Sequence, residues 1–193
     1  KSVPAASNIK LVEDPNDNPG IRSQISYGFT FPATLATAAY LGKNPSLTAN
    51  NCQIFTSYEF FEDHYNKLKS MIDREKYTIV ITEICDQTTA SNAVMDFLKG
   101  EEKIIIVKTH SLGVEQSRLE FIDLAIYLDS NLCNLDEYEA SMLGSCRQVD
   151  IYNNKVVFIG GAGIVNNTEI FTSRIEGLSK EYEDTPDNSP ATK

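Results

Sequence analysis

The sequence lacks several features that mark particular classes of protein. Its 193 residues include no tryptophan and only two histidines, and no uninterrupted apolar run is long enough to cross a bilayer. Acidic residues outnumber basic ones by 27 to 17, which gives a formal net charge of -10. Such a charge opposes binding to a phosphate backbone. We therefore expect no nucleic-acid partner, no transmembrane segment and a cytoplasmic location.

A metal-binding cysteine pattern is also missing. The four cysteines are Cys52, Cys85, Cys133 and Cys146. None belongs to a C-x-x-C pair, and His64 and His110 are the only histidines that could complete a metal site. Cys52 and Cys85 lie in or beside apolar runs, where a free cysteine behaves as a small hydrophobe. We expect reduced structural thiols, with disulfides as the less favoured alternative.

What the sequence does contain is an alternation of apolar strands and helical segments. Runs rich in β-branched residues predict buried strands at 77–82 (YTIVIT) and 103–107 (KIIIV). Shorter strands are predicted at 9–13, 52–55 and 124–128, with a hairpin at 149–159. Helices are predicted at 34–41, 57–73, 88–98, 114–122, 135–143 and 168–182.

This alternation predicts the fold class. Continuous apolar strands separated by helices favour a three-layer α/β fold, in which a mostly parallel sheet carries helices on both faces, as in RecA-like or Rossmann-like domains. We expect one such domain at residues 9–182. It would lie between a flexible tail at 1–8 and a flexible acidic tail at 183–193, both rich in small and polar residues.

Polar and acidic side chains follow several predicted strands, at the edge where ligands of open parallel sheets bind. Glu13 and Asp14 follow the first strand, and Glu83 follows the central one. A carboxylate in that position holds magnesium or orients the attacking water in nucleoside triphosphatases. His110, after the next strand, could act as a general acid or base. The alternatives are that Glu83 caps the following helix and that His110 is an ordinary surface residue.

Three segments, in this order, resemble motifs of the ATPases that drive pilus retraction and bacterial secretion. KLVEDPNDNPGIRSQ resembles the family's aspartate box, IVITEICDQTTASNAV its Walker B region, and IIIVKTHSLGVEQSRLEFIDL its histidine box. The residues that match the last two motifs are Glu83, Asp86, Thr88, His110 and Arg118. Thr82, Cys85 and Lys103 depart from them, because the family has glycine, arginine and histidine there.

The resemblance implies a motor-type ATPase domain that uses ATP and Mg²⁺ and works with protein partners or as a homo-oligomer. It implies catalytic roles for Glu83, Glu13 and His110, and magnesium ligation by Glu83 and Asp86. The cofactor-binding residues implied are Asp14, Asp86, Thr88 and Arg118. The phosphate-binding motif G-x-x-x-x-G-K-[ST] does not occur. Either that loop lies upstream of Lys1 in a longer chain, or this is a degenerate, non-catalytic relative.

Two further interpretations remain open. One is a catalytically silent α/β module that binds a protein partner within a larger assembly. The other rests on VITEICDQTTASNAV followed later by IYLDSNLCNLDEYEASMLG, which together resemble ribokinase-type sugar kinases. Those enzymes require an aspartate after their G-A-G motif, and here Ile164 follows Gly163. The glycine run at 160–163 is short of G-x-G-x-x-G and follows a late strand, so it is interpreted as a tight turn rather than a nucleotide loop.

Overall fold

The computed structural model describes residues 28–109, 115–131, 139–166 and 168–184. Its strands are β1 (Phe29–Phe31), β2 (Ala33–Leu35), β3 (Leu47–Phe60), β4 (Tyr77–Cys85), β5 (Ile104–Thr109), β6 (Gly144–Ile151) and β7 (Val156–Gly161). Its helices are α1 (Glu62–Met71), α2 (Gln87–Lys99), α3 (Glu115–Leu128), α4 (Gly163–Asn166) and α5 (Thr168–Asp184). Two short 3₁₀ helices are η1 (Ala38–Tyr40) and η3 (Ala140–Met142).

The seven strands form one mixed sheet in the order β1-β7-β6-β3-β4-β5-β2. Parallel pairing joins β3, β4 and β5, with Ile54 beside Ile79 and Ile79 beside Ile105. The remaining neighbours pair antiparallel: β3 with β6, β6 with β7, β7 with β1, and β5 with β2. The long strand β3 is central, because it joins the parallel strands to the antiparallel ones.

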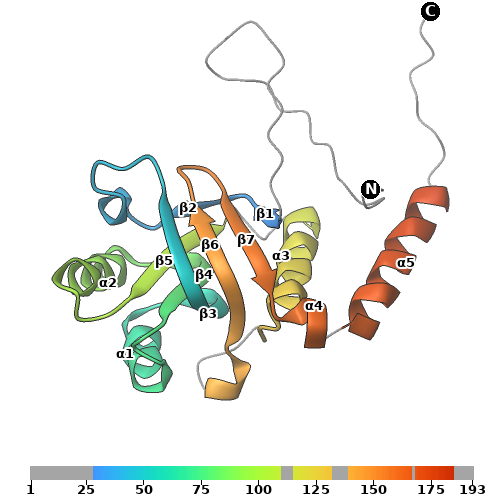
Figure 1. Ribbon diagram of the computed structural model, residues 1–193. Helices are drawn as coiled ribbons and strands as arrows, with labels where there is room; N and C mark the ends of the chain where they lie inside the picture. Colours follow the sequence, from blue (N-terminus) through green and yellow to red (C-terminus); the bar gives the residue numbers. More distant parts are fainter. Residues whose placement is uncertain (1–27, 110–114, 132–138, 167, 185–193) are drawn as a thin grey trace, which may run out of the picture.

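Helices cover both faces of the sheet, with α1 and α2 on one side and α3 on the other (Figure 1). On β4, Val80 belongs to a buried cluster that includes Leu68 of α1. Its neighbours Ile79 and Ile81 belong to the cluster that includes Phe121 of α3. Successive strand residues point to opposite faces, so these clusters are the two cores of a three-layer structure. The predicted α/β class is confirmed.

Several predicted elements are confirmed with small shifts of their ends. The strands at 77–82 and 103–107 correspond to β4 and β5, and the hairpin at 149–159 to β6 and β7. The helix predicted at 88–98 is α2, and Gly100 ends it in the left-handed conformation with φ of 72°. The strand predicted at 9–13 and the first four residues of the helix predicted at 135–143 lie outside the described residues. The described part of that second segment contains the short 3₁₀ helix η3.

Other segments differ from their predictions because tertiary pairing overrides local preference. Residues 57–60 were predicted to begin a helix, but they extend β3, where Phe60 pairs with Cys85 of β4. Residues 34–41 were also predicted to be helical, but Leu35 of β2 pairs with Val107 of β5. The strand predicted at 124–128 is the second half of α3, and the fully buried Leu124 and Leu128 share one face of it at helical spacing.

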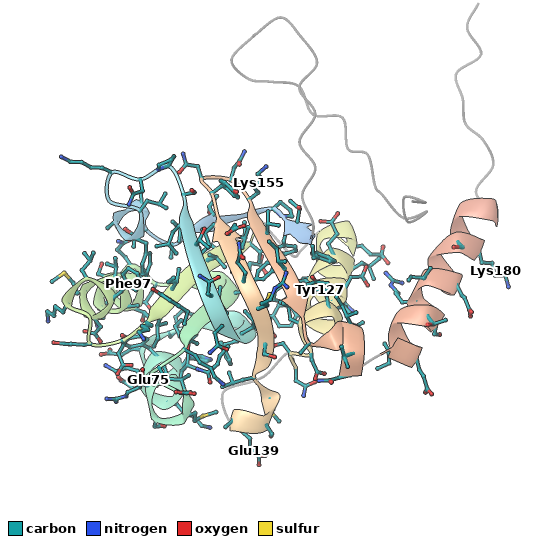
Figure 2. The ribbon with its side chains drawn as sticks, viewed as in Figure 1. Glu75, Phe97, Tyr127, Glu139, Lys155 and Lys180 are labelled. Atoms are coloured by element: carbon teal, nitrogen blue, oxygen red, sulfur yellow. The ribbon has the colours of Figure 1, made fainter. Side chains whose placement is uncertain are left out.

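The glycines after β7 allow the chain to pass close to α3. Gly160 has a φ of 70°, which is unfavourable for residues with a side chain. Gly161 and Gly163 pack against the backbone of Ile126 and Tyr127, so closely that a Cβ atom at either position would overlap it. Tyr127, labelled in Figure 2, donates a hydrogen bond from its hydroxyl to the carbonyl oxygen of Phe158 at 3.2 Å. The glycine run is therefore a close-packed turn from strand to helix.

Candidate functional site

The structure brings together three of the residues that sequence reasoning had assigned to a nucleotide site. Glu83 lies near the end of β4, Asp86 is the N-cap of α2, and Thr88 lies in the first turn of that helix. Arg118 lies on α3, which covers the other face of the sheet. The remaining predicted site residues, Glu13, Asp14 and His110, lie outside the described residues.

The carboxylate of Asp86 has a structural partner at each oxygen. Oδ1 accepts a hydrogen bond from the backbone N–H of Thr89 at 2.9 Å, and Oδ2 accepts one from the Thr89 hydroxyl at 2.6 Å. These hydrogen bonds stabilise the ionised form and hold the pKa of Asp86 below its usual value. The helix cap that we had considered for Glu83 is thus made by Asp86. Within the described ranges, no three histidine, cysteine or acidic residues gather into a metal-binding group.

Replacing Asp86 with alanine is expected to lower the free energy of unfolding by about 1 kcal/mol, because α2 loses its N-cap. A depressed pKa means that this contribution is present at neutral pH and fades as the pH falls below about 4. Thermal unfolding followed by circular dichroism should show a drop of about 2–4 °C at pH 7. Thr88→Ala, on the exposed side of the same turn, is the control. Equal losses in both variants would contradict the capping role.

Large apolar side chains are exposed at the carboxyl ends of β3 and β4, beside the exposed acidic residues Glu59 and Glu62. Tyr58, Phe61 and Ile84 are 38%, 36% and 46% exposed, respectively, and we call them the strand-end surface. Their backbones are held together by the hydroxyl of Thr82, which can donate to the carbonyl oxygens of Tyr58 and Ile84, each at 3.1 Å. The ring of Tyr58 lies 5.9 Å from the buried ring of Phe121. The edge predicted to bind a nucleotide therefore exposes apolar side chains among acidic ones.

A second apolar surface lies on the outer side of α2. Met95 and Leu98, one helical turn apart, are 51% and 60% exposed, and we call them the α2 patch. The helix is anchored on its inner side by Asp96, which accepts hydrogen bonds from the Tyr65 hydroxyl at 2.7 Å and from Lys69 Nζ at 2.9 Å. Phe97, labelled in Figure 2, packs edge-on against Tyr40 at 5.3 Å. The α2 patch is thus presented on a helix that is fixed to the core.

A third feature is a polar cavity of ≈ 370 Å³ between β3, β6 and the start of β4. Its lining includes Gln53, Lys76, Ser145 and Arg147, together with Cys52 and Cys146. Lys76 also forms an ion pair with Asp73, at 3.6 Å. The cavity lies near the amino end of β4, away from the strand-end surface.

Comparison with known proteins identifies relatives of a different kind from those expected. No family model matches the chain. It is 25% identical over 126 residues to the mitochondrial chaperonin CPN60-1 of Zea mays, and 24% identical to CPN60-2 of Cucurbita maxima and to CPN60 of Arabidopsis thaliana. Each match covers 60% of this chain but only 22% of the relative, so the aligned part spans about a fifth of those proteins.

A solved structure gives the same indication at the level of the fold. The chaperonin gp146 of the Pseudomonas aeruginosa bacteriophage EL, crystallised in the presence of ATP-BeFx, matches with a TM-score of 0.57 and 14% identity. The match covers 83% of this chain and 33% of the phage protein. At this identity the similarity shows a shared fold.

These findings overturn the resemblance to pilus and secretion ATPases. Both comparisons lead to chaperonins, so the motor-type and RecA-like ATPase assignment and the secretion context are wrong. The alternatives of a silent interaction module and a ribokinase-like fragment find no support in either comparison. The physical reason is that a buried strand followed by an acid is not specific to nucleotide binding, because such an acid also serves as a helix cap, as Asp86 does.

Proposed function

We propose that this chain is part of a chaperonin-type protein and that its contribution is to hold non-native polypeptides through exposed apolar side chains. The observation that carries the proposal is the agreement between the sequence comparison and the fold comparison, both of which lead to chaperonins. Because the aligned part covers only about a fifth of the curated relatives, the activity of a whole chaperonin belongs to the proposal.

The α2 patch has the physical character that such binding requires. Unfolded chains expose apolar side chains of many shapes, so a surface that accepts them must be apolar and adaptable. Methionine suits this role, because its unbranched side chain and polarisable sulfur adjust to different partners. Met95 and Leu98 lie side by side on one exposed face, whereas Ala93 and Val94 of the same helix are buried. The strand-end surface offers a second apolar contact of the same kind.

Under this proposal, the expected partners and cofactors are those of a chaperonin-type protein. The protein partners would be non-native clients and further copies of the chain. ATP and Mg²⁺ would act on the assembled chaperonin-type protein, as the ATP-BeFx in the phage chaperonin crystals suggests. The nucleotide roles predicted for Glu83 and Arg118 gain no support from the comparisons.

Two expectations about organisation and location also become proposals. The domain at 9–182, with tails at 1–8 and 183–193, stays a prediction, as does the cytoplasmic location. The plant relatives are named as mitochondrial proteins. None of the helices in the described residues is both long and apolar enough to cross a membrane.

The proposal predicts that adding charge to the α2 patch weakens client binding. The client is a reduced and carboxymethylated model protein that cannot refold, and its binding is measured by fluorescence anisotropy. Met95→Lys combined with Leu98→Lys should weaken binding about tenfold or more, because burial of each side chain contributes roughly 1.5–3 kcal/mol. Gln87→Lys combined with Asn92→Lys is the matched control, since it adds the same two charges to exposed positions of the same helix.

A third variant, Ile84→Lys, separates the two surfaces. If only this variant weakens binding, the client lies on the strand-end surface and the assignment to the α2 patch is wrong. If the wild-type chain does not bind the client, or if the Gln87→Lys and Asn92→Lys control weakens binding as much as the patch variant does, the proposed function itself is contradicted. Circular dichroism of each variant establishes that the fold is retained.

A further inference from the structure

Two cysteines lie directly opposite each other on neighbouring strands. In the antiparallel pairing of β3 with β6, Cys52 is the register partner of Cys146. Both thiols are unpaired, and the two residues are only 2% and 4% exposed. The residues belong to the same core cluster, so their side chains point to the same face of the sheet. The third described cysteine, Cys85, lies at the far end of β4 and belongs to the other core.

The position of the pair suits a disulfide without movement of the backbone. Directly opposite residues of antiparallel strands have Cα atoms about 4.5–5.5 Å apart. Disulfides span Cα distances of about 4.4–6.8 Å. Burial raises the pKa of Cys52 to about 12, and the charge of the neighbouring Cys146 thiolate raises it further. The two thiols therefore influence each other electrostatically. The Cys146 thiol lies 3.2 Å from the carbonyl oxygens of Gln148 and Ile159.

The polar cavity borders the two strands at the pair. Its lining residues include both cysteines and the cationic residues Lys76 and Arg147. Burial raises the pKa of Cys146, and backbone hydrogen bonds and the charge of Arg147 oppose this effect in part. Because both thiols are buried, a peroxide reaches them when this part of the sheet opens locally.

We propose that Cys52 and Cys146 are a site of oxidative modification, at which a peroxide converts the two thiols into a cross-strand disulfide. The Cys146 thiolate attacks one oxygen of hydrogen peroxide, the O–O bond breaks, and a sulfenic acid forms with release of one water after protonation. The sulfur of Cys52 then attacks the sulfenic sulfur and releases a second water. Two thiols are oxidised, one peroxide is reduced, and the products are one disulfide and two waters.

The disulfide would lock the centre of the sheet. It would join β3 to β6 across about ninety intervening residues, and closing a loop of that length strongly restricts the unfolded chain. The oxidised protein should therefore unfold at a higher temperature, by about 5–15 °C. This inference does not depend on client binding, so either proposal can fail without the other.

The test is peptide mapping by mass spectrometry of the full chain, before and after treatment with hydrogen peroxide. A crosslinked peptide pair containing Cys52 and Cys146 is expected, and its formation should accelerate about tenfold per pH unit because the thiolates react. Cys52→Ser and Cys146→Ser should each lose both the crosslink and the gain in thermal midpoint, whereas Cys85→Ser should keep them.

Two outcomes would overturn the proposal. One is that wild-type protein retains two free thiols at these positions after oxidation has modified Cys85. The other is a disulfide that pairs either residue with a different cysteine. Because mapping of the wild-type protein identifies the crosslink directly, the result does not depend on whether the serine variants fold.

Discussion

Gly163→Ala is expected to lower the free energy of unfolding by about 2–4 kcal/mol, a large part of the 5–15 kcal/mol typical of a domain. A Cβ atom at this position would overlap the carbonyl oxygen of Ile126 and lie 2.8 Å from that of Tyr127. Both obstacles are backbone atoms of α3, which cannot rotate away as a side chain could. Urea unfolding, followed by circular dichroism because the chain has no tryptophan, should show the loss.

The matched control is Gly177→Ala, within α5. A Cβ atom there meets no other atom within 4 Å, and alanine favours the helical conformation by up to about 1 kcal/mol over glycine. The control should therefore unfold at the same urea concentration as the wild-type chain, or at a higher one. If Gly163→Ala behaved like this control, the close approach of the turn to α3 would be wrong.

Phe121→Ala should cost about 3–5 kcal/mol, because it leaves a cavity between α3 and the sheet. The side chain is fully buried, and its ring lies 6.2 Å from that of Phe31 and 5.9 Å from that of Tyr58. The same urea experiment measures the loss. The variant should also destabilise the strand-end surface, since Tyr58 rests on the ring that is removed.

Leu119→Ala, two residues earlier on α3, is the control for Phe121→Ala. Leu119 is 42% exposed, so truncating it should change the free energy of unfolding by less than about 1 kcal/mol. Comparable losses in the two variants would mean that α3 does not pack on the sheet through Phe121.

Much of the fold could be predicted from the sequence because its strands carry a strong local signal. Ile104 to Val107 are all buried, two on each face, and such a continuous apolar run is typical of a central strand. The strand prediction for the apolar run at 124–128 is wrong because a short apolar segment fits a strand and a buried helix equally well. In the structure this segment continues the helix that begins at Glu115, and that continuity shows that it is helical.

The candidate site could be predicted less well, for a physical reason. Periodicity locates a helix but does not show which of its apolar residues will be covered. In α2, Ala90, Ala93 and Val94 form the buried stripe, and Met95 and Leu98 fall outside it. The sequence signal for the exposed patch was that these two large apolar residues lie outside the buried stripe. Acidic residues after strands form the more conspicuous pattern, but one of them, Asp86, caps the helix.

The central position of β3 has a consequence for how the chain reaches its folded state. Its parallel neighbour β4 follows soon after it, whereas its antiparallel neighbour β6 pairs Leu47 with Ile151, far along the chain. Contacts between such distant segments form slowly, since a long loop must first close. Until β6 is made and docks, one edge of β3 lacks its hydrogen-bond partners and can pair with another molecule. The chain is therefore expected to be most prone to self-association after β3 is synthesised and before β6 pairs with it.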